Sequence, residues 1–269
     1  MQITSAMKMV SAAKLKRAQD AITEMRPYAQ KLEEILVNVS ATLDSSEGVY
    51  ARKAENVQKV LLVAISSNRG LAGAFNANIM KAVTRQINTN PGVQYDLYAM
   101  GKKVFDLSSR RGLSMLGERN SIYDDLTFDN VSEIAEMLME KFREGEYDRI
   151  ELVYNQFKNA AVQYVQVEQF LPVREVEGDD SAQTDYIYEP SKVEILEDLI
   201  PKSLKTQLFK AMLDSYASEH GARMTAMHKA TDNASDLKKQ LKLSYNQARQ
   251  AAITNEILEI VGGAEALKG

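Results

Sequence analysis

Both ends of the chain carry apolar side chains at alternating spacings of three and four residues. This spacing averages about 3.5 residues, which is the period of a left-handed coiled coil. The pattern predicts a helix over residues 2 to about 44. Its apolar stripe consists of Leu15, Ala18, Ile22, Met25, Ala29, Leu32, Leu36, Val39 and Leu43.

Upstream of Leu15 the apolar stripe changes its phase. Ile3, Met7 and Val10 keep the rhythm in a shifted register, so the pattern predicts a slip between Val10 and Leu15. Pro27 lies further along the same helix. Because proline lacks a backbone donor and clashes with the preceding turn, we expect a kink or a brief interruption there.

The last part of the chain has the same period. A helix is predicted from Pro201, which suits a first turn, to Val261, and only Gly221 interrupts it. At about 1.5 Å per residue it would span roughly 90 Å, against roughly 65 Å for the first helix. We expect the two helices to pair antiparallel and the carboxyl end to project alone. The second stripe consists of Met224, Met227, Ala230, Ala234, Leu237, Leu241, Tyr245, Ala248 and Ala252.

Between residues 50 and 200 the pattern changes to that of an α/β domain. A continuous apolar run, VLLVAISS, has the length of a buried strand, and the alternating VQYVQVEQFLP favours an edge strand. Strands that alternate with helices predict an open sheet with right-handed crossovers. We expect strands at Val60–Ser67, Gln94–Met100, Asp148–Phe157 and Val162–Pro172, and helices at Phe75–Ile87, after Gly101 and at Val131–Phe142.

The predicted fold is therefore α/β plus coiled coil. A long antiparallel two-helix coiled coil from both termini flanks a central Rossmann-like domain, with expected bounds of 1–48, 49–200 and 201–269. The acidic segment Glu175–Asp198 favours a solvated loop over an acidic binding tail. Because the stripes are rich in alanine and bury little area, we expect something around the rod to help hold it together.

Composition excludes several classes of protein. The 269 residues include no cysteine, which excludes disulfides and thiolate metal sites. No window approaches about 18 uncharged apolar residues, so we expect no membrane span. No charged stretch followed by an apolar one opens the chain, so we expect no secretory signal. A net charge of −4 gives no general reason to expect nucleic acid.

One segment is a candidate for phosphate binding. SSNRGLAGAFN, at Ser66–Asn76, follows a buried strand and opens a helix, as phosphate-binding loops do. However, it lacks the Lys-Ser/Thr ending of a P-loop, and Gly70 and Gly73 do not complete a GxGxxG motif. A tight turn that lets the helix approach the strand is the favoured interpretation.

No other group of residues predicts an active site. His220 and His228 would lie about 80° apart around a helix, which favours solvated or interface positions over a metal site. The pairs Asp124–Asp125 and Asp179–Asp180 favour solvated loops over general acid–base catalysis. No serine stands in a GxSxG context. We expect no catalytic residue, no cofactor and no metal.

The first helix has a basic surface of small side chains. ITSAMKMVSAAKLKRAQ, at Ile3–Gln19, interleaves alanine and serine with methionine and lysine. Its basic stripe fits a solvated face or an acidic partner equally well. Nucleic acid is less favoured, because no aromatic residues are interleaved for stacking. The stripe consists of Lys8, Lys14, Lys16 and Arg17, with Lys229, Lys238, Lys239, Lys242 and Arg249 on the last helix.

These segments are similar to the gamma subunits of F-type ATP synthases. The resemblance rests on ITSAMKMVSAAKLKRAQ, SSNRGLAGAFN, YEP at Tyr188–Pro190, and the long ARMTAMHKATDNASDLKKQLKLSYNQARQAAITNEILEIVGGAEAL at Ala222–Leu267. It covers essentially the whole chain. The segment Leu171–Pro190 lacks the long insert with a regulatory thiol pair found in chloroplast members, which favours a bacterial type. Family members normally begin with a longer first helix.

The resemblance implies a mechanical function. The paired helices would turn inside a ring of alpha and beta subunits. The α/β domain would lie against the epsilon subunit and the ring of c subunits. Proton flow would drive this rotor and be coupled to ATP synthesis or hydrolysis on the ring, with no catalytic site on this chain. The implied location is peripheral, on the cytoplasmic face of a bacterial inner membrane.

The resemblance also implies contacts with the beta subunits. Met7 and Lys8 would face acidic loops of these subunits. Arg249 and Gln250, in QARQ, would hydrogen-bond beta-subunit loops near the other end of the shaft, and Ile260–Leu267 would reach an upper bearing.

From the residues alone, two other functions stay open. A nucleotide-binding α/β protein with coiled-coil dimerisation arms would bind its ligand at Gly70–Gly73. A coiled-coil scaffold that uses the basic stripe for RNA or anionic lipid would show binding that weakens steeply with salt.

Overall fold

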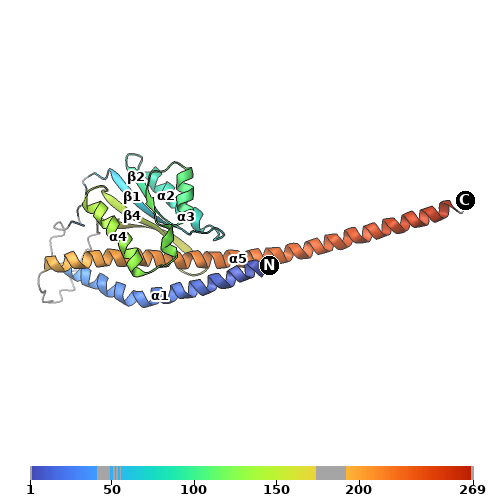
Figure 1. Ribbon diagram of the computed structural model, residues 1–269, viewed down its shortest axis with the longest axis horizontal. Helices are drawn as coiled ribbons and strands as arrows, with labels where there is room; N and C mark the ends of the chain where they lie inside the picture. The colour runs from blue at the N-terminus through green and yellow to red at the C-terminus, as the bar shows by residue number, and fades with distance from the viewer. Residues whose placement is uncertain are drawn as a thin grey trace.

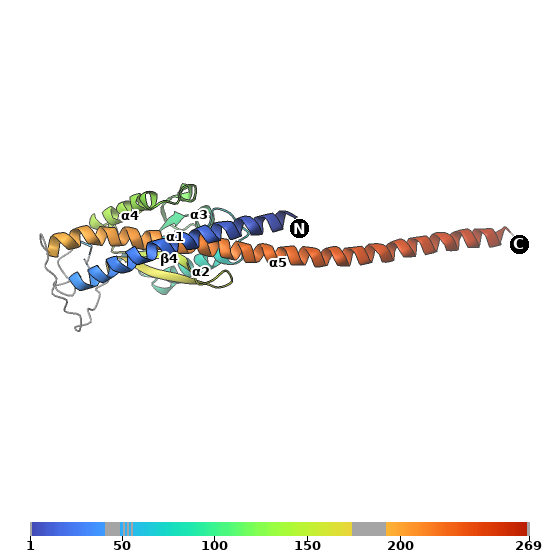
Figure 2. The same cartoon turned by 90° about the horizontal axis from the view of Figure 1, so that it is seen from below.

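The computed structural model describes residues 2–40, 49–50, 52, 54, 56–173 and 192–267. A long helix at each end of the chain lies beside a compact α/β domain, and the last helix projects far beyond the rest (Figures 1 and 2). The described elements are α1 Gln2–Ser40, β1 Lys59–Ile65, α2 Phe75–Thr89, β2 Gln94–Met100, α3 Lys102–Arg110, β3 Met115–Glu118, η1 Asn120–Tyr123, α4 Phe128–Arg143, β4 Arg149–Phe157, β5 Gln163–Leu171 and α5 Lys192–Ala266.

The domain is built on a five-stranded sheet of order β3-β2-β1-β4-β5. β1 pairs in parallel with β2 and β4, β3 pairs in parallel with β2, and β5 returns antiparallel on β4 as an edge strand. The apolar run in β1 is explained by its place in the middle of the sheet, where it is buried on both faces. The predicted open α/β sheet is thus confirmed.

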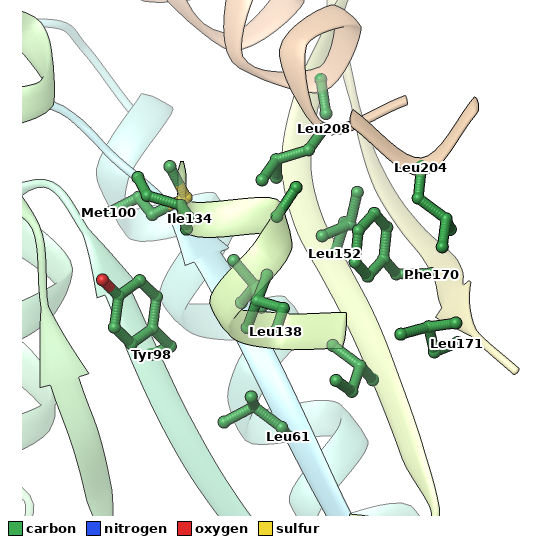
Figure 3. Packing of buried hydrophobic residues seen from close by; sticks show 14 of the residues in the cluster. Leu61, Tyr98, Met100, Ile134, Leu138, Leu152, Phe170, Leu171, Leu204 and Leu208 are labelled. Carbon is green, nitrogen blue, oxygen red and sulfur yellow. The ribbon is translucent and has the colours of Figure 1, made fainter. Parts of the chain in front are cut away.

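Helices cover both faces of the sheet. On one face, α2 and α3 pack against Val60, Leu62 and Ala64 of β1. On the other face, α4 and the first half of α5 pack against the alternate side chains of the same strand, which include Leu61 (Figure 3). Leu204 and Leu208 of α5 belong to this second core, so the long helix is an integral part of the domain.

α1 runs antiparallel to α5, with its amino end beside the middle of α5 (Figures 1 and 2). Leu15, Ala18 and Leu32 of the predicted stripe are buried, and Ile22 and Met25 are half-buried. The antiparallel pair and the projecting carboxyl end are therefore as predicted. α1 continues through Pro27 without an interruption.

The predicted register slip near Val10 is wrong. Ile3 and Val10 are 77% and 58% exposed, so they lie off the interface. Thr4, Lys8 and Ser11 take their places, because Thr231 Oγ1 of α5 donates to Thr4 Oγ1 at 2.7 Å and Ser11 is buried. The observed interface therefore keeps the heptad spacing of Leu15 and Ala18 back to Thr4, without a slip. The sequence pattern missed this because the first residues of the interface are polar.

The start of α5 and two short elements differ from the prediction. α5 begins at Lys192, and Pro201 lies inside it, where an ion pair of 2.5 Å between Lys202 and Asp198 spans the proline. β3 and η1 were not predicted, since four-residue elements carry too little periodicity to detect. Most of the predicted acidic loop, residues 174–191, lies outside the described residues.

Candidate functional site

The far half of α5 is a long surface without a packed neighbour among the described residues. Every residue from Asp236 to Leu267 is exposed in the part of the chain that the structure describes, where Gln2, the first residue of α1, lies near the level of Thr231 on α5. At about 1.5 Å per residue this part of the shaft is roughly 45 Å long. Large exposed apolar side chains on a helix are typical of a surface that another protein covers. They are Leu237, Leu241, Leu243, Tyr245, Ile253, Ile257, Leu258, Ile260 and Val261.

The four predicted contact residues lie at two levels of this shaft. Met7 and Lys8 are half-buried near the amino end of α1, where Lys8 Nζ donates to His228 Nδ1 at 3.5 Å. Arg249 and Gln250 are exposed on the lone part of α5, roughly 30 Å further along from His228. The structure does not bring the two pairs together, and it leaves both beside unpartnered surface.

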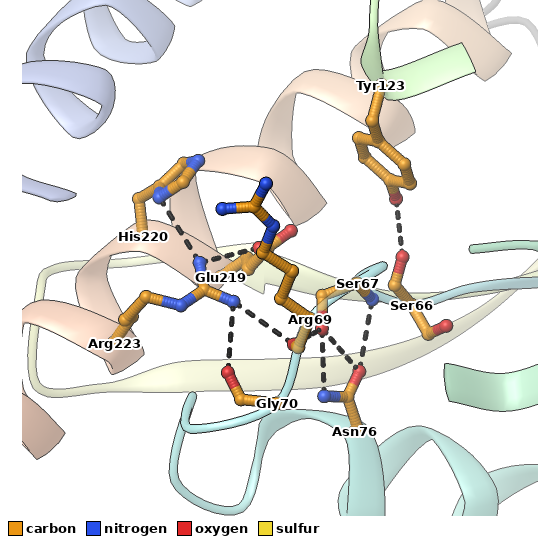
Figure 4. A network of polar contacts seen from close by, with 9 residues as sticks. All are labelled: Ser66, Ser67, Arg69, Gly70, Asn76, Tyr123, Glu219, His220 and Arg223. Atoms are coloured by element: carbon orange, nitrogen blue, oxygen red, sulfur yellow. Dashed lines mark hydrogen bonds and ion pairs between the residues drawn. The ribbon is translucent and has the colours of Figure 1, made fainter. Parts of the chain in front are cut away.

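The loop Ser66–Asn76 contacts α5 through its carbonyl groups (Figure 4). Arg223 Nη2 donates to Arg69 O at 3.2 Å and to Gly70 O at 3.4 Å, while Arg223 Nη1 donates to Glu219 Oε1 at 2.6 Å. A loop that presents oxygen atoms to a guanidinium is arranged for a cation, and a phosphate would need N–H groups there.

The backbone donors beside this loop already have partners. Ser66 Oγ accepts from Val104 N at 2.9 Å and Asn68 Oδ1 accepts from Lys102 N at 3.0 Å, so the first turn of α3 is capped by the loop. Gly73 adopts a φ of +57°, as a tight turn requires. The tight-turn interpretation is therefore favoured over a phosphate site at this loop.

Burial sets the protonation of the groups around Arg223. It raises the pKa of the Glu219 carboxyl, an effect that the ion pair with Arg223 opposes. Burial, with the positive charge of Arg223, lowers the pKa of His220 to about 3, so this imidazole stays neutral. Its ring contacts Tyr216 edge-on at 4.5 Å between centroids, and its Nε2 atom has no partner among the described residues.

The remaining candidates do not form a site. His228 is exposed beside Lys8, away from His220, and the described residues contain no group of acidic or histidine side chains suited to a metal. Asp124 and Asp125 are exposed, and Asp125 accepts from Asn130 Nδ2 at the start of α4, as expected for a solvated loop. Asp179–Asp180 lies outside the described residues.

Sequence reasoning missed Arg223 and Glu219. They are 7% and 6% exposed inside a helix, although each carries a charge. Their partner loop lies more than 150 residues away in the chain, which no local pattern reveals. The one available signal was Gly221 between them, since glycine inside a helix indicates that another backbone approaches closely.

Comparison with known proteins gives a consistent result over the whole chain. A family model described as ATP synthase matches residues 1–267. The ATP synthase gamma chain of Flavobacterium psychrophilum is 65% identical over 270 aligned positions, covering 100% of this chain and 94% of that one. The ATP synthase gamma chain of Cytophaga hutchinsonii is 51% identical, covering 99% of this chain and 93% of that one.

Solved structures give the same picture. A chain of the Tetrahymena thermophila mitochondrial ATP synthase, from a structure of the central stalk and c-ring, aligns with a TM-score of 0.63 and 26% identity, covering 85% of this chain and 99% of that one. A chain of the Euglena gracilis mitochondrial ATP synthase shares the fold at a TM-score of 0.60 and 21% identity, covering 98% and 95%. Among the described helices of the present chain, none has the length and apolarity that a membrane span requires.

Proposed function

The chain belongs to the family of ATP synthase gamma chains, and from this premise we propose how its structure serves the rotor of an F-type ATP synthase. A gamma chain is a subunit of the central stalk, and no catalytic role of its own is known from the relatives described above. The proposal concerns the finer question of which surfaces meet which partners.

We propose that the projecting half of α5 stands inside the ring of alpha and beta subunits. The observation that carries this is the row of exposed apolar side chains from Leu237 to Val261 on a helix without a packed neighbour. An isolated helix of this kind is only marginally stable in water, and exposed apolar side chains favour a surface that other protein segments cover. The small side chains of α1, such as Ala12 and Ala13, are also exposed and keep the lower shaft slim.

Contacts with the beta subunits are proposed at both levels of the shaft. Met7 and Lys8 lie beside α5 at the level of His228, and we place the entry of the shaft into the ring at this level. Arg249 and Gln250 are exposed further up and free to bond with subunit loops. The α/β domain would then remain outside the ring, against the epsilon subunit and the c-ring, peripheral to the cytoplasmic face of the inner membrane.

Reconstitution tests the function directly. The purified chain should hydrolyse no ATP alone and should raise the ATPase activity of a mixture of alpha and beta subunits. Failure to assemble with either subunit, or activity of the chain by itself, would contradict the proposal.

A charge introduced at Met7 tests the lower contact. Met7→Lys should hold the acidic beta-subunit loops more tightly and lower the number of protons pumped per ATP hydrolysed in membrane vesicles. Met9→Lys is the matched control, because Met9 is 64% exposed and lies about 200° away around α1. Equal pumping ratios in the two variants would count against Met7 as a contact.

A further inference from the structure

One face of α5 follows the end of the β4–β5 hairpin with heptad spacing. We define this hairpin face by Gln207, Ala211, Asp214, Ser218, Gly221 and Thr225, which are separated by 4, 3, 4, 3 and 4 residues. It is distinct from the face that meets α1, where Ala217 packs with Leu15 and Ala18. Four of its six members are polar, although the segment 211–221 is buried apart from the half-buried Tyr216.

The hairpin face bonds mainly to backbone. Ser218 Oγ donates to Asn155 O at 3.0 Å, in β4. Thr225 Oγ1 lies 3.0 Å from Ala160 O, at the tip of the hairpin, and also within reach of the carbonyl of its own helix. Gln207 Nε2 donates to Gln169 O at 3.2 Å and to the side-chain Glu168 Oε1 at 2.7 Å, both in β5.

Gly221 brings the two backbones together between these bonds. A Cβ atom at this position would lie 3.1 Å from Ala160 Cα, which is closer than side chains normally approach. Glycine inside a helix is unfavourable by about 1 kcal/mol relative to alanine. Its presence here is explained by the close approach, and the approach places the hydroxyls of Ser218 and Thr225 within bonding distance of the hairpin.

Polar contacts of this kind select one arrangement of the helix. Apolar packing is non-directional, so the core formed by Leu204 and Leu208 would tolerate small rotations of α5. A hydroxyl that donates a hydrogen bond to a buried carbonyl can do so only from a narrow range of positions. A buried carbonyl that loses this hydrogen bond lowers the stability of the fold. Buried polar groups are known to specify register in packed helices, at some expense of stability.

We propose that the hairpin face is a rotational key, through which the α/β domain and the shaft turn as one body. The inference rests on the proposed rotor function and adds the positioning residues Ser218, Gly221 and Thr225 to it. If the domain is driven from the membrane side, the turning force must pass into α5 before the helix leaves the domain near Thr225. In the part of the chain that the structure describes, Thr225 is the last residue of α5 that hydrogen-bonds to the α/β domain, through Ala160 O.

A distance measurement tests the key in the isolated chain. Because the chain has no cysteine, Lys158→Cys on the hairpin and Lys229→Cys on α5 give two unique sites for spin labels, both exposed. Loss of one such bond should raise the population of misplaced registers by about tenfold. In Ser218→Ala/Thr225→Val the distribution of distances should therefore broaden or divide. A distribution as narrow as that of the unmodified chain would overturn the key.

The matched control is Thr206→Val. Thr206 is a buried threonine of α5, whereas Thr225 is half-buried, and the Thr206 hydroxyl donates only to Lys202 O of the same helix, at 2.8 Å. It should keep the narrow distribution, as should Thr225→Ser, which retains the hydroxyl. Broadening in Thr206→Val would show a general loosening of α5 and would also overturn the proposal.

Coupling in the assembled enzyme tests the functional part. Ser218→Ala/Thr225→Val should pump at least about twofold fewer protons per ATP than Thr206→Val, with equal ATPase activity, because the shaft can slip within its domain. An unchanged ratio in a variant with broadened distances would overturn the role in transmission. Failure of the unmodified chain to stimulate the ring would instead contradict the proposed function itself.

Discussion

At the scale of single residues, two buried titratable groups on α5 have opposite effects on the stability of the fold as the pH falls. The Asp214 carboxyl is 8% exposed, and burial raises its pKa to about 6, with only partial relief from Lys210 and the Phe157 N–H. A carboxyl with a raised pKa destabilises the fold when ionised, and this loss disappears as the pH falls from above 6 to below 4. His220, with a pKa of about 3, behaves in the opposite way, because stability is lost as the pH falls from 6.5 towards 3.

Asp214→Asn separates these two effects. At pH 7.5 the variant should be more stable than the unmodified chain by on the order of 2 kcal/mol, since the buried charge is gone. At pH 4.5 the difference should shrink to about a third of that value. Urea unfolding of the isolated chain at both pH values measures it.

The contribution of His220 should then become visible. Over the range from pH 6 to pH 4.5, Asp214→Asn should lose stability more steeply than the unmodified chain, because the gain from Asp214 no longer offsets the loss from His220. Parallel curves for the two proteins over this range would contradict the assigned protonation states.

At the scale of elements, the ends of β1 and β2 are joined around a glycine. Ser66 N donates to Met100 O at 2.8 Å. Ser66 Oγ donates to Gly101 O and accepts from Val104 N in the first turn of α3. Gly101 has a φ of +117°, and a Cβ atom there would lie 2.1 Å from Ser66 O. This glycine is required both by its backbone conformation and by the space around it.

Gly101→Ala should therefore destabilise the domain by about 3 kcal/mol or more. Gly73→Ala is the matched comparison, since Gly73 also has a positive φ, but nothing lies within 4 Å of its would-be Cβ. The second variant should lose only about 1 kcal/mol. If the two variants lost equal free energy of unfolding in urea, the backbone conformation alone would explain both losses, and the close contact at Gly101 would not matter.

The sequence predicted long periodic elements well and polar interfaces poorly. β2 was predicted with its observed bounds, and the stripe from Leu15 to Leu32 was identified, because apolar periodicity records burial. The amino end of α1 was misread, since Thr4 and Lys8 meet α5 through polar groups. The contact of Arg223 with the loop at Gly70 was out of reach, because it depends on how the whole domain folds.

At the scale of the whole molecule, the shaft changes from a surrounded helix to a solitary one. Residues 204–225 of α5 contact the sheet, the hairpin and α1, whereas residues 236–267 are exposed. In the isolated chain, the fraction of time that α5 is helical should therefore decrease towards its carboxyl end, because a lone helix is only marginally stable. The four contact residues proposed for the beta subunits and the bounds of the three-part division stay predictions at this scale.

Limited digestion with trypsin should detect this change. In the isolated chain the first cuts should fall after Lys238, Lys239, Lys242 or Arg249, all of them exposed on the lone helix, and leave a stable amino-terminal fragment. Assembly with alpha and beta subunits should protect the same sites. Initial cleavage within the α/β domain, or no protection on assembly, would contradict the arrangement.

The three contact faces of α5 also restrict how the length of this chain can change. Adding or removing one residue between Leu204 and Thr225 would turn the rest of the helix by about 100°. The sheet core, the hairpin face and the α1 stripe would then be misaligned together, and no local rearrangement could restore all three. Insertions and deletions should be tolerated in the loops of the domain and excluded from this part of the helix. Its length therefore fixes how the three contact faces are aligned.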